Sequence, residues 1–266
     1  MADNAKPQKL RALLEAWPKG TVAVQPWLSR QGVSRFLAKR YQQYQWVKRI
    51  GSGAYVRPTD SVDWTGGLYA IQAQLGLPVH AGGKTALELQ GYGHFVPLGE
   101  GGPVYLFGEP KARLPAWFLR HAWKVRQVYA TKTLFPKDPK AGLSEKSFGD
   151  YSIKLSTPER AMLELLTRVS DEDSFEEARL LMEGLLGLQP EFTQELLAAC
   201  GSVKAKRLFL FLADLCGHGW VDKLDVLNLD LGKGKRSVVK GGRLDPRYQI
   251  TVPARMAQPA SSPESA

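Results

Sequence analysis

The sequence predicts an α+β protein in which a small basic N-terminal domain precedes a larger mixed α/β domain with a helical core. Its 266 residues exceed the usual single-domain size of about 100 to 150 residues, so two domains are expected. The hydrophobic fraction of 44% and the charged fraction of 23% are typical of soluble globular proteins. We expect domains at 1–95 and 96–256, and the composition of the last residues predicts a disordered tail at 257–266.

Positive charge is concentrated at the two ends of the chain. Residues 1–60 hold eleven Lys and Arg against three acids, 61–230 hold 18 against 21, and 231–266 hold seven against two. A local excess of this size in a short folded segment is expected for a partner with a phosphate backbone. A solvated surface or a segment lying on a membrane would carry such charge too. The residues between the cations are therefore needed to distinguish nucleic-acid binding from these alternatives.

Composition also bears on location and on metal chemistry. No stretch approaches the roughly 20 apolar residues that cross a bilayer, and residues 1–9 are polar, so we expect a cytoplasmic protein without membrane association. Cys200 and Cys216 are too few for a disulfide framework or a zinc site, and we expect both to be small buried residues. The four histidines lack metal-binding spacing. We therefore expect no metal, no cofactor and no catalytic residues.

Three helices are predicted in the basic N-terminal segment. Residues 9–17 carry an amphipathic stripe at spacings of three and four, which Pro18 and Gly20 end. Residues 21–30 predict a short second helix, closed by a turn at Gly32. Ser34 is placed to cap a third helix. The apolar residues expected on the inner face of this third helix are Phe36, Leu37, Tyr41 and Tyr44.

The outer face of the third helix is basic and rich in amides. Arg can bind guanine through two hydrogen bonds, and Gln can do the same with adenine. Two β-prone runs follow, at 46–50 and 54–58, around a glycine turn, and they predict a hairpin. Helix, helix, turn, basic helix and hairpin is the order of a winged helix-turn-helix domain. Candidate DNA-binding residues are Ser34, Arg35, Lys39, Arg40, Gln43, Lys48, Arg49, Ser52 and Arg57. A winged helix with solvated charges remains the alternative.

The segment Gly82-Gly83-Lys84-Thr85 invites comparison with a phosphate-binding loop. A Walker A loop requires a glycine five positions before Gly83, and Pro78 stands there. No clear apolar strand precedes the segment either. We expect instead a glycine turn that leads into a short helix, with Thr85 near its cap.

The C-terminal half predicts two strands, at 103–107 and 124–129, around a helical stretch at 115–123, and then a surface loop at 136–147. A hydroxyl cap followed by Pro158 and Glu159 begins a helix, and three more helices are expected at 175–188, 190–200 and 203–217, with a strand at 248–253. Two groups of cations are candidate anion-binding residues: Lys204, Lys206 and Arg207 at a helix start, and Lys233, Lys235 and Arg236 in a glycine-containing loop. A solvated helix start and a basic turn are the alternatives.

Several segments together resemble the AbiEi-type antitoxins of type IV, abortive-infection toxin–antitoxin systems. They are 49–55, 64–72, 75–80, 82–92, 157–161, 203–209, 231–236 and 248–253, and they span most of the chain. The resemblance implies a winged helix that binds inverted repeats in double-stranded DNA upstream of its own operon and represses it. It also implies a larger C-terminal domain that counters a nucleotidyltransferase-like toxin. Both groups of cations are candidate antitoxin residues in that domain. Inverted repeats would recruit two copies, as a dimer or as monomers that pair on the DNA.

The resemblance assigns DNA contacts to the positions that match the family's recognition helix and wing: Ser34, Arg35, Lys39, Gln43, Lys48, Arg49 and Ser52. It makes the segment at 82–85 a family signature near the domain junction. Two other functions stay open from the residues alone. One is an enzyme that processes nucleic acids or nucleotides through the basic glycine loops. The sequence shows no carboxylate cluster for metal ions and no Ser/His/Asp set that would support it. The other is a winged-helix module that binds a partner protein. We expect a protein that is not an enzyme.

Overall fold

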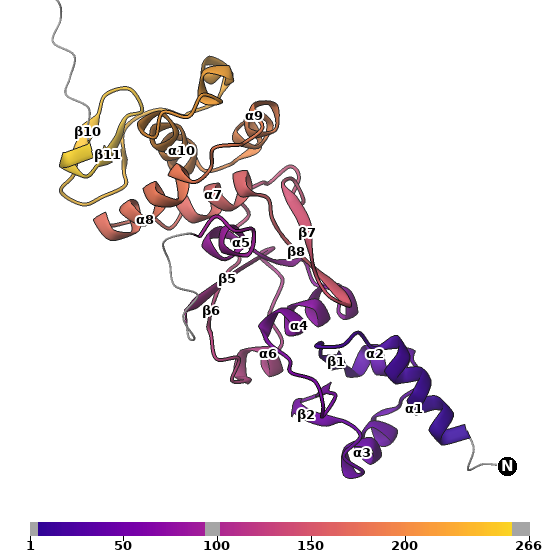
Figure 1. Cartoon of the computed structure of the whole chain (residues 1–266). Helices are drawn as coiled ribbons and strands as arrows, with labels where there is room; N and C mark the ends of the chain where they lie inside the picture. The colour runs from indigo at the N-terminus through magenta and orange to yellow at the C-terminus, as the bar shows by residue number, and fades with distance from the viewer. Residues whose placement is uncertain (1–4, 94–101, 257–266) are drawn as a thin grey trace, which may run out of the picture. The chain divides into compact units, whose positions relative to one another are not determined.

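The computed structural model describes residues 5–93 and 102–256 of the chain (Figure 1). The predicted tail at 257–266 lies outside the described residues. The chain forms two compact units, each made from several stretches of sequence: 1–81, 98–132 and 144–155 in the first, and 82–97, 133–143 and 156–266 in the second, as far as these ranges are described. Within 5–93 and 102–256, every helix falls short of the length and apolar content that a bilayer crossing requires.

The first unit begins with three helices around one apolar core. They are α1 (Ala5–Ala16), α2 (Gln25–Arg30) and α3 (Arg35–Gln43). Strands β1 (Ala23–Val24), β2 (Lys48–Gly51) and β3 (Ala54–Val56) form an antiparallel sheet with β3 in the middle. The core residues shared by these elements are Leu13, Trp17, Ala23, Leu28, Val33, Ala38, Tyr41, Val47 and Tyr55. The amphipathic stripe of the first helix and the hairpin are thereby confirmed.

The expectation of a helix from residue 21 is wrong for its first four residues. Ala23 and Val24 form a strand that pairs with Tyr55 and Ala54, and the helix begins only at Gln25, with Pro26 in its first turn. On its other side β1 is held by the Gln74 side chain, which accepts a hydrogen bond from Val24 N at 2.9 Å and donates one to Val22 O at 2.8 Å. These bonds satisfy buried backbone groups that a fourth strand would otherwise pair.

Helix α4 (Trp64–Tyr69) explains two glycines that weaken its helical propensity. Its cap is Asp63, and it continues as the π-helical turn η1 (Ala70–Gln74). A Cβ at Gly66 would lie 1.9 Å from Gly20 O, and one at Gly67 would lie 2.9 Å from the rings of Phe118 and Trp123. Glycine is therefore needed here for close packing, which outweighs its cost of about 1 kcal/mol in a helix.

A five-stranded sheet of order β6-β5-β4-β8-β7 completes the first unit. Its strands are β4 (Val79–Ala81), β5 (Pro103–Gly108), β6 (Arg126–Ala130), β7 (Leu143–Phe148) and β8 (Tyr151–Ser156), and helix α6 (Ala116–Arg120) lies between β5 and β6 in sequence. Strand β4 is antiparallel to β5 and parallel to β8. The predicted β5, α6 and β6 are confirmed. The predicted loop at 136–147 is wrong in its last part, because β7 begins at Leu143.

The second unit has the helical core that was predicted. It contains α5 (Gly83–Leu89), α7 (Pro158–Leu166), α8 (Glu172–Glu183), α9 (Pro190–Ala199) and α10 (Val203–Leu215). Helix α7 is buried from Glu159 to Leu166, and its first turn holds Pro158, but the Thr157 side chain makes no cap hydrogen bond. Short 3-10 turns η2 (Val221–Lys223), η3 (Val226–Asn228) and η4 (Ala254–Met256) and a small sheet of β9 (Arg236–Ser237), β10 (Arg243–Asp245) and β11 (Ile250–Val252) follow.

Candidate nucleic-acid interface

Helix α3 presents a basic face because its cap and its core contacts fix its orientation. The Ser34 hydroxyl accepts a hydrogen bond from Leu37 N at 3.2 Å, which caps the helix and leaves the hydroxyl hydrogen for another acceptor. Ala38 and Tyr41 are buried in the core of the first unit. The opposite side carries the four exposed residues that we call the basic face of α3: Arg35, Lys39, Gln42 and Gln43. Arg40 lies at its flank, half-buried.

Two aromatic residues of this helix lie outside the core, contrary to the prediction. Phe36 is 73% exposed and Tyr44 is 57% exposed. Only Leu37 and Tyr41, of the four residues expected on the inner face, contact the core. Tyr44 is the C-cap of α3 and stacks on Trp46, with ring centroids 5.3 Å apart. Phe36 is in the first turn, where the helical repeat places it between Gln43 and Arg40 on the exposed side.

The β2–β3 turn carries the second group of predicted contacts. Lys48, Arg49 and Ser52 are all exposed. Gly53 has a φ of +67°, a conformation that glycine adopts without strain, and the pairing of β2 with β3 shifts register between Arg49 and Gly51. The Arg49 Nε donates to Gly51 O at 2.9 Å, so this side chain follows the turn.

A cleft of about 760 Å³ joins α3 to this turn. Its lining includes all four residues of the basic face together with Arg49 and Ser52, and none of the described residues that line it is acidic. We call it the basic cleft. Its remaining lining residues are Val24, Gln25, Pro26, Gly53, Tyr55, Leu75, Pro115 and Trp117. Pro115 and Trp117 were not predicted to lie here, because α6 packs against β2 from more than sixty residues further along the chain.

Arg57 does not belong with these residues, and its prediction as a wing contact needs correction. Only 12% of its side chain is exposed, and its Nε lies 3.7 Å from the Asp60 carboxylate. Its guanidinium also lies 5.7 Å from the centre of the Trp17 ring. Arg57 therefore neutralises Asp60 and packs on the core, because the chain leaves the sheet at this point and turns back toward α1.

The cations at the start of α10 also serve the fold. Arg207 is 4% exposed and donates to four backbone oxygens, of Leu231, Gly232, Gly234 and Gln249. Lys206 is buried, and Lys204 donates to Val169 O. The expectation that these three cations are available to an anion is therefore wrong for Arg207, whose guanidinium holds the backbone of the following basic loop.

The basic loop itself remains accessible. Lys233 and Lys235 are exposed, and Arg236 donates to the carbonyl oxygens of both lysines. Gly232 and Gly234 have φ values of +64° and +75°, which permit the sharp backbone course that brings their carbonyls to Arg207. Of the six C-terminal candidates, Lys233 and Lys235 thus expose their charges to solvent. They lie on a loop whose backbone Arg207 stabilises through hydrogen bonds.

The Gly82–Thr85 segment binds a carboxylate of α7 at the helix start, where a phosphate-binding loop would bind a phosphate. Gly83 N, at the start of α5, donates to Glu164 Oε2 at 3.0 Å, and Lys84 pairs with Glu177 and, at 3.8 Å, with Glu88. Burial raises the pKa of Glu88, against the opposing effect of Lys84. A strand, β4, does precede the segment, contrary to expectation, but the lysine and the helix start are already occupied.

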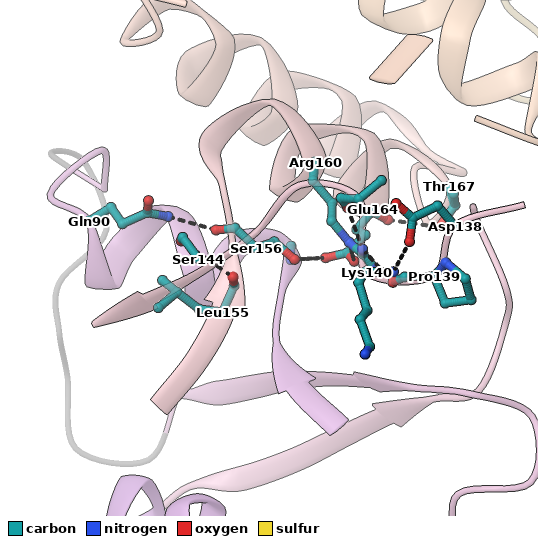
Figure 2. Close-up of polar contacts among 12 residues, drawn as sticks. Gln90, Asp138, Pro139, Lys140, Ser144, Leu155, Ser156, Arg160, Glu164 and Thr167 are labelled. Carbon is teal, nitrogen blue, oxygen red and sulfur yellow. Dashed lines mark hydrogen bonds and ion pairs between the residues drawn. The ribbon is translucent and has the colours of Figure 1, made fainter. Parts of the chain in front are cut away.

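Glu164 is the centre of a buried polar network (Figure 2). Its carboxylate accepts hydrogen bonds from Ser156 Oγ at 2.8 Å and from Arg160 Nε at 2.8 Å. Arg160 in turn donates to the carbonyl oxygens of Pro139 and Ala141, which fixes the loop before β7. The Glu164 carboxylate of this network is the anion bound at the start of α5. The Gly82–Thr85 segment therefore stabilises the fold. Among the residues that the structure describes, no three His, Cys, Asp or Glu side chains gather as metal ligands.

Comparisons with known proteins agree with these observations. Residues 6–98 match the family model described as transcriptional regulator, AbiEi antitoxin N-terminal domain, and residues 102–253 match the model described as transcriptional regulator, AbiEi antitoxin, type IV toxin–antitoxin system. The chain is similar in fold to the crystal structure of the RV2827C protein from Mycobacterium tuberculosis, with a TM-score of 0.55, 16% identity, and 92% of this chain and 90% of that chain covered. No curated protein matches the sequence.

Proposed function

Because the chain belongs to the AbiEi antitoxin family, the transcriptional regulators of type IV toxin–antitoxin systems, we propose that its N-terminal elements form a winged helix that binds operator DNA. Helix α3 is the recognition helix in this proposal, and the β2–β3 turn is the wing. The order of α1, β1, α2, α3, β2 and β3, with the antiparallel β1-β3-β2 sheet, supports it.

The observation that carries the proposal is the basic cleft. A DNA duplex requires cations for its phosphates and hydrogen-bonding side chains for its base edges, and the lining of the basic cleft offers both. Arg35 and Gln43 are of the types that bind bases bidentately, whereas Arg49 and the neighbouring Lys48 suit the phosphate backbone. Among the lining residues that the structure describes, no carboxylate opposes a polyanion.

We further propose that the protein binds inverted repeats upstream of its own operon and represses it, and that the C-terminal domain counters a nucleotidyltransferase-like toxin. The match of residues 102–253 to the antitoxin model supports the second role. Two copies would occupy the two half-sites, one helical turn of DNA or a multiple of it apart.

An electrophoretic mobility shift with the intergenic DNA upstream of the gene tests the DNA-binding half. We expect the full chain to bind this duplex at least tenfold more tightly than a scrambled duplex of equal length, with an affinity that falls steeply as salt rises because counterions are released. Equal binding of the two duplexes would refute operator recognition.

The toxin-countering half requires a separate test, since both functions lie in one chain. Co-expression with the neighbouring toxin gene should restore growth when the wild-type chain is present. The double variant Arg35→Ala, Lys39→Ala should still restore growth from an independent promoter, because neither residue lies in the region 102–253 that matches the antitoxin model. Loss of protection in this variant would show that neutralisation depends on the DNA-binding face.

A further inference from the structure

Phe36 is an exposed apolar side chain at the edge of the basic face of α3, where the helical repeat places it between Gln43 and Arg40. It is 73% exposed, and it belongs neither to the core cluster nor to the partly buried residues that pack against that cluster. It occupies the first turn of α3, next to Arg35 and one helical turn before Lys39 and Arg40. Helix α3 itself contains no acidic residue. A ring this exposed contributes little to the stability of the fold. We therefore look for its partner in the molecule that binds this face of α3.

The position within α3 points to the base edges of a duplex. In helix-turn-helix domains the N-terminal residues of the recognition helix contact the bases in the major groove, and Phe36 is the second residue of α3. The major groove exposes one apolar group, the C5 methyl of thymine, and phenylalanine is among the side chains that contact it. We infer that Phe36 is a specificity-determining residue that contacts a thymine methyl group in each half-site. This inference rests on the proposed operator binding.

The other exposed aromatic residues of this region do not share the position. Tyr44 lies at the opposite end of α3 and stacks on Trp46. Trp46 also contacts the buried Tyr41 ring, at 5.5 Å between centroids. Both rings therefore have partners within the protein, whereas the Phe36 ring has no aromatic partner among the described residues. This difference makes Tyr44 a matched control on the same helix.

Replacement of thymine by uracil removes the methyl group and leaves base pairing intact. The upstream intergenic duplex is prepared twice, once with thymine and once with uracil throughout, and its affinity for the full chain is measured with both. The wild-type protein should bind the uracil duplex less tightly, by about fourfold for each thymine contacted, which corresponds to the loss of one buried methyl group. Phe36→Ala should bind both duplexes with equal affinity, and Phe36→Leu should retain part of the difference.

The ratio between the two duplexes separates the outcomes. Tyr44→Ala should keep the wild-type ratio. If Phe36→Ala also keeps it, while binding both duplexes more weakly, the ring contacts protein or phosphate and the inference is overturned. If the wild-type protein fails to distinguish the upstream duplex from a scrambled one, the proposed function fails and the inference fails with it. Single uracil substitutions in the thymine duplex then locate the contacted base in each half-site.

Discussion

Gly51 in β2 lies so close to Trp117 in α6 that an added Cβ would be 2.6 Å from the Trp117 Cβ. Real Cβ atoms do not approach one another to this distance, so the backbone of β2 and the α6 helix are in contact only because residue 51 has no side chain. Both residues belong to the first unit. Trp117 lines the basic cleft, and Gly51 begins the turn that carries Ser52. The position of this turn therefore depends on a glycine.

Gly51→Ala should displace β2 from α6. We expect a loss of about 1–3 kcal/mol in the free energy of unfolding, as for other overpacked sites, together with weaker binding of the upstream duplex. Urea unfolding and mobility shifts measure the two effects. Gly187→Ala is the control, since a Cβ there would have no atom within 4 Å. An unchanged unfolding midpoint for Gly51→Ala would contradict the close contact.

Arg35 and Lys48 should differ in the kind of DNA affinity that they support. Arg35→Ala or Gln43→Ala should cost about 1–3 kcal/mol on the upstream duplex and little on a scrambled one, because a base contact is lost. Lys48→Ala should weaken both duplexes alike and reduce the slope of log affinity against log salt by about 1. Titrations at several salt concentrations measure this. Lys137→Ala, an exposed lysine of the second unit, removes the same charge and should change neither slope nor specificity.

Arg57 and Arg49 should give opposite results. Arg57→Ala leaves Asp60 without its cation and removes packing on Trp17, so we expect the unfolding free energy to fall by about 1–2 kcal/mol with DNA affinity unchanged. Arg49→Ala should weaken DNA binding with little change in stability. Both quantities are measured on the same preparations, with DNA binding compared at equal concentrations of folded protein. A loss of DNA affinity in folded Arg57→Ala would show that Arg57 contacts DNA.

Glu164→Gln tests the buried network. The substitution leaves the Arg160 guanidinium buried without its carboxylate, and we expect a loss of about 3–5 kcal/mol in the free energy of unfolding. Glu183→Gln provides the comparison, because Glu183 pairs with Arg179 while its side chain is 60% exposed, and such surface pairs contribute about 1 kcal/mol or less. Similar urea midpoints for the two variants would show that the network contributes little.

His121 should make stability depend on pH. Burial first, and the nearby Lys48 second, lower the pKa of His121 from its usual value. The unfolded chain therefore takes up a proton at higher pH than the folded one does. The contribution of this residue to stability is fully present above about pH 6.5 and is lost as the pH falls through the folded pKa. Urea midpoints between pH 7.5 and 5 should fall less steeply for His121→Gln, and a parallel decline in both proteins would disprove the link.

The sequence patterns predicted those elements that depend on residues close together in the chain. The stripe at 9–17 predicted α1, and the cap at Ser34 predicted the start of α3. Strand β1 was missed because two residues carry no periodicity, and it exists through pairing with β3 some thirty residues further on. The hydrogen bonds of the Gln74 side chain to residues 22 and 24, which hold the other side of β1, were likewise missed, because they join segments some fifty residues apart.

The cations predicted as candidate site residues include some that the structure exposes and some that it buries. A charge count treats Arg49, Arg57 and Arg207 alike. The structure separates them through partners distant in sequence or in a returning loop: Asp60 and Trp17 for Arg57, and the backbone of 231–249 for Arg207. Helical spacing also placed Phe36 in the core, because periodicity shows that a face is apolar without showing which apolar residues the neighbouring elements reach.

The order of strands in the five-stranded sheet has a consequence for fragments. Strand β4 lies between β5 and β8, and both partners follow residue 98 in the sequence. A truncated protein that ended there would keep β4 with two open edges and would lose the residues of α6 that seat Gly51. Such edges recruit other chains and promote aggregation. Precipitation of such an N-terminal fragment would then result from the unpaired edges of β4. It would say nothing about what the full chain binds.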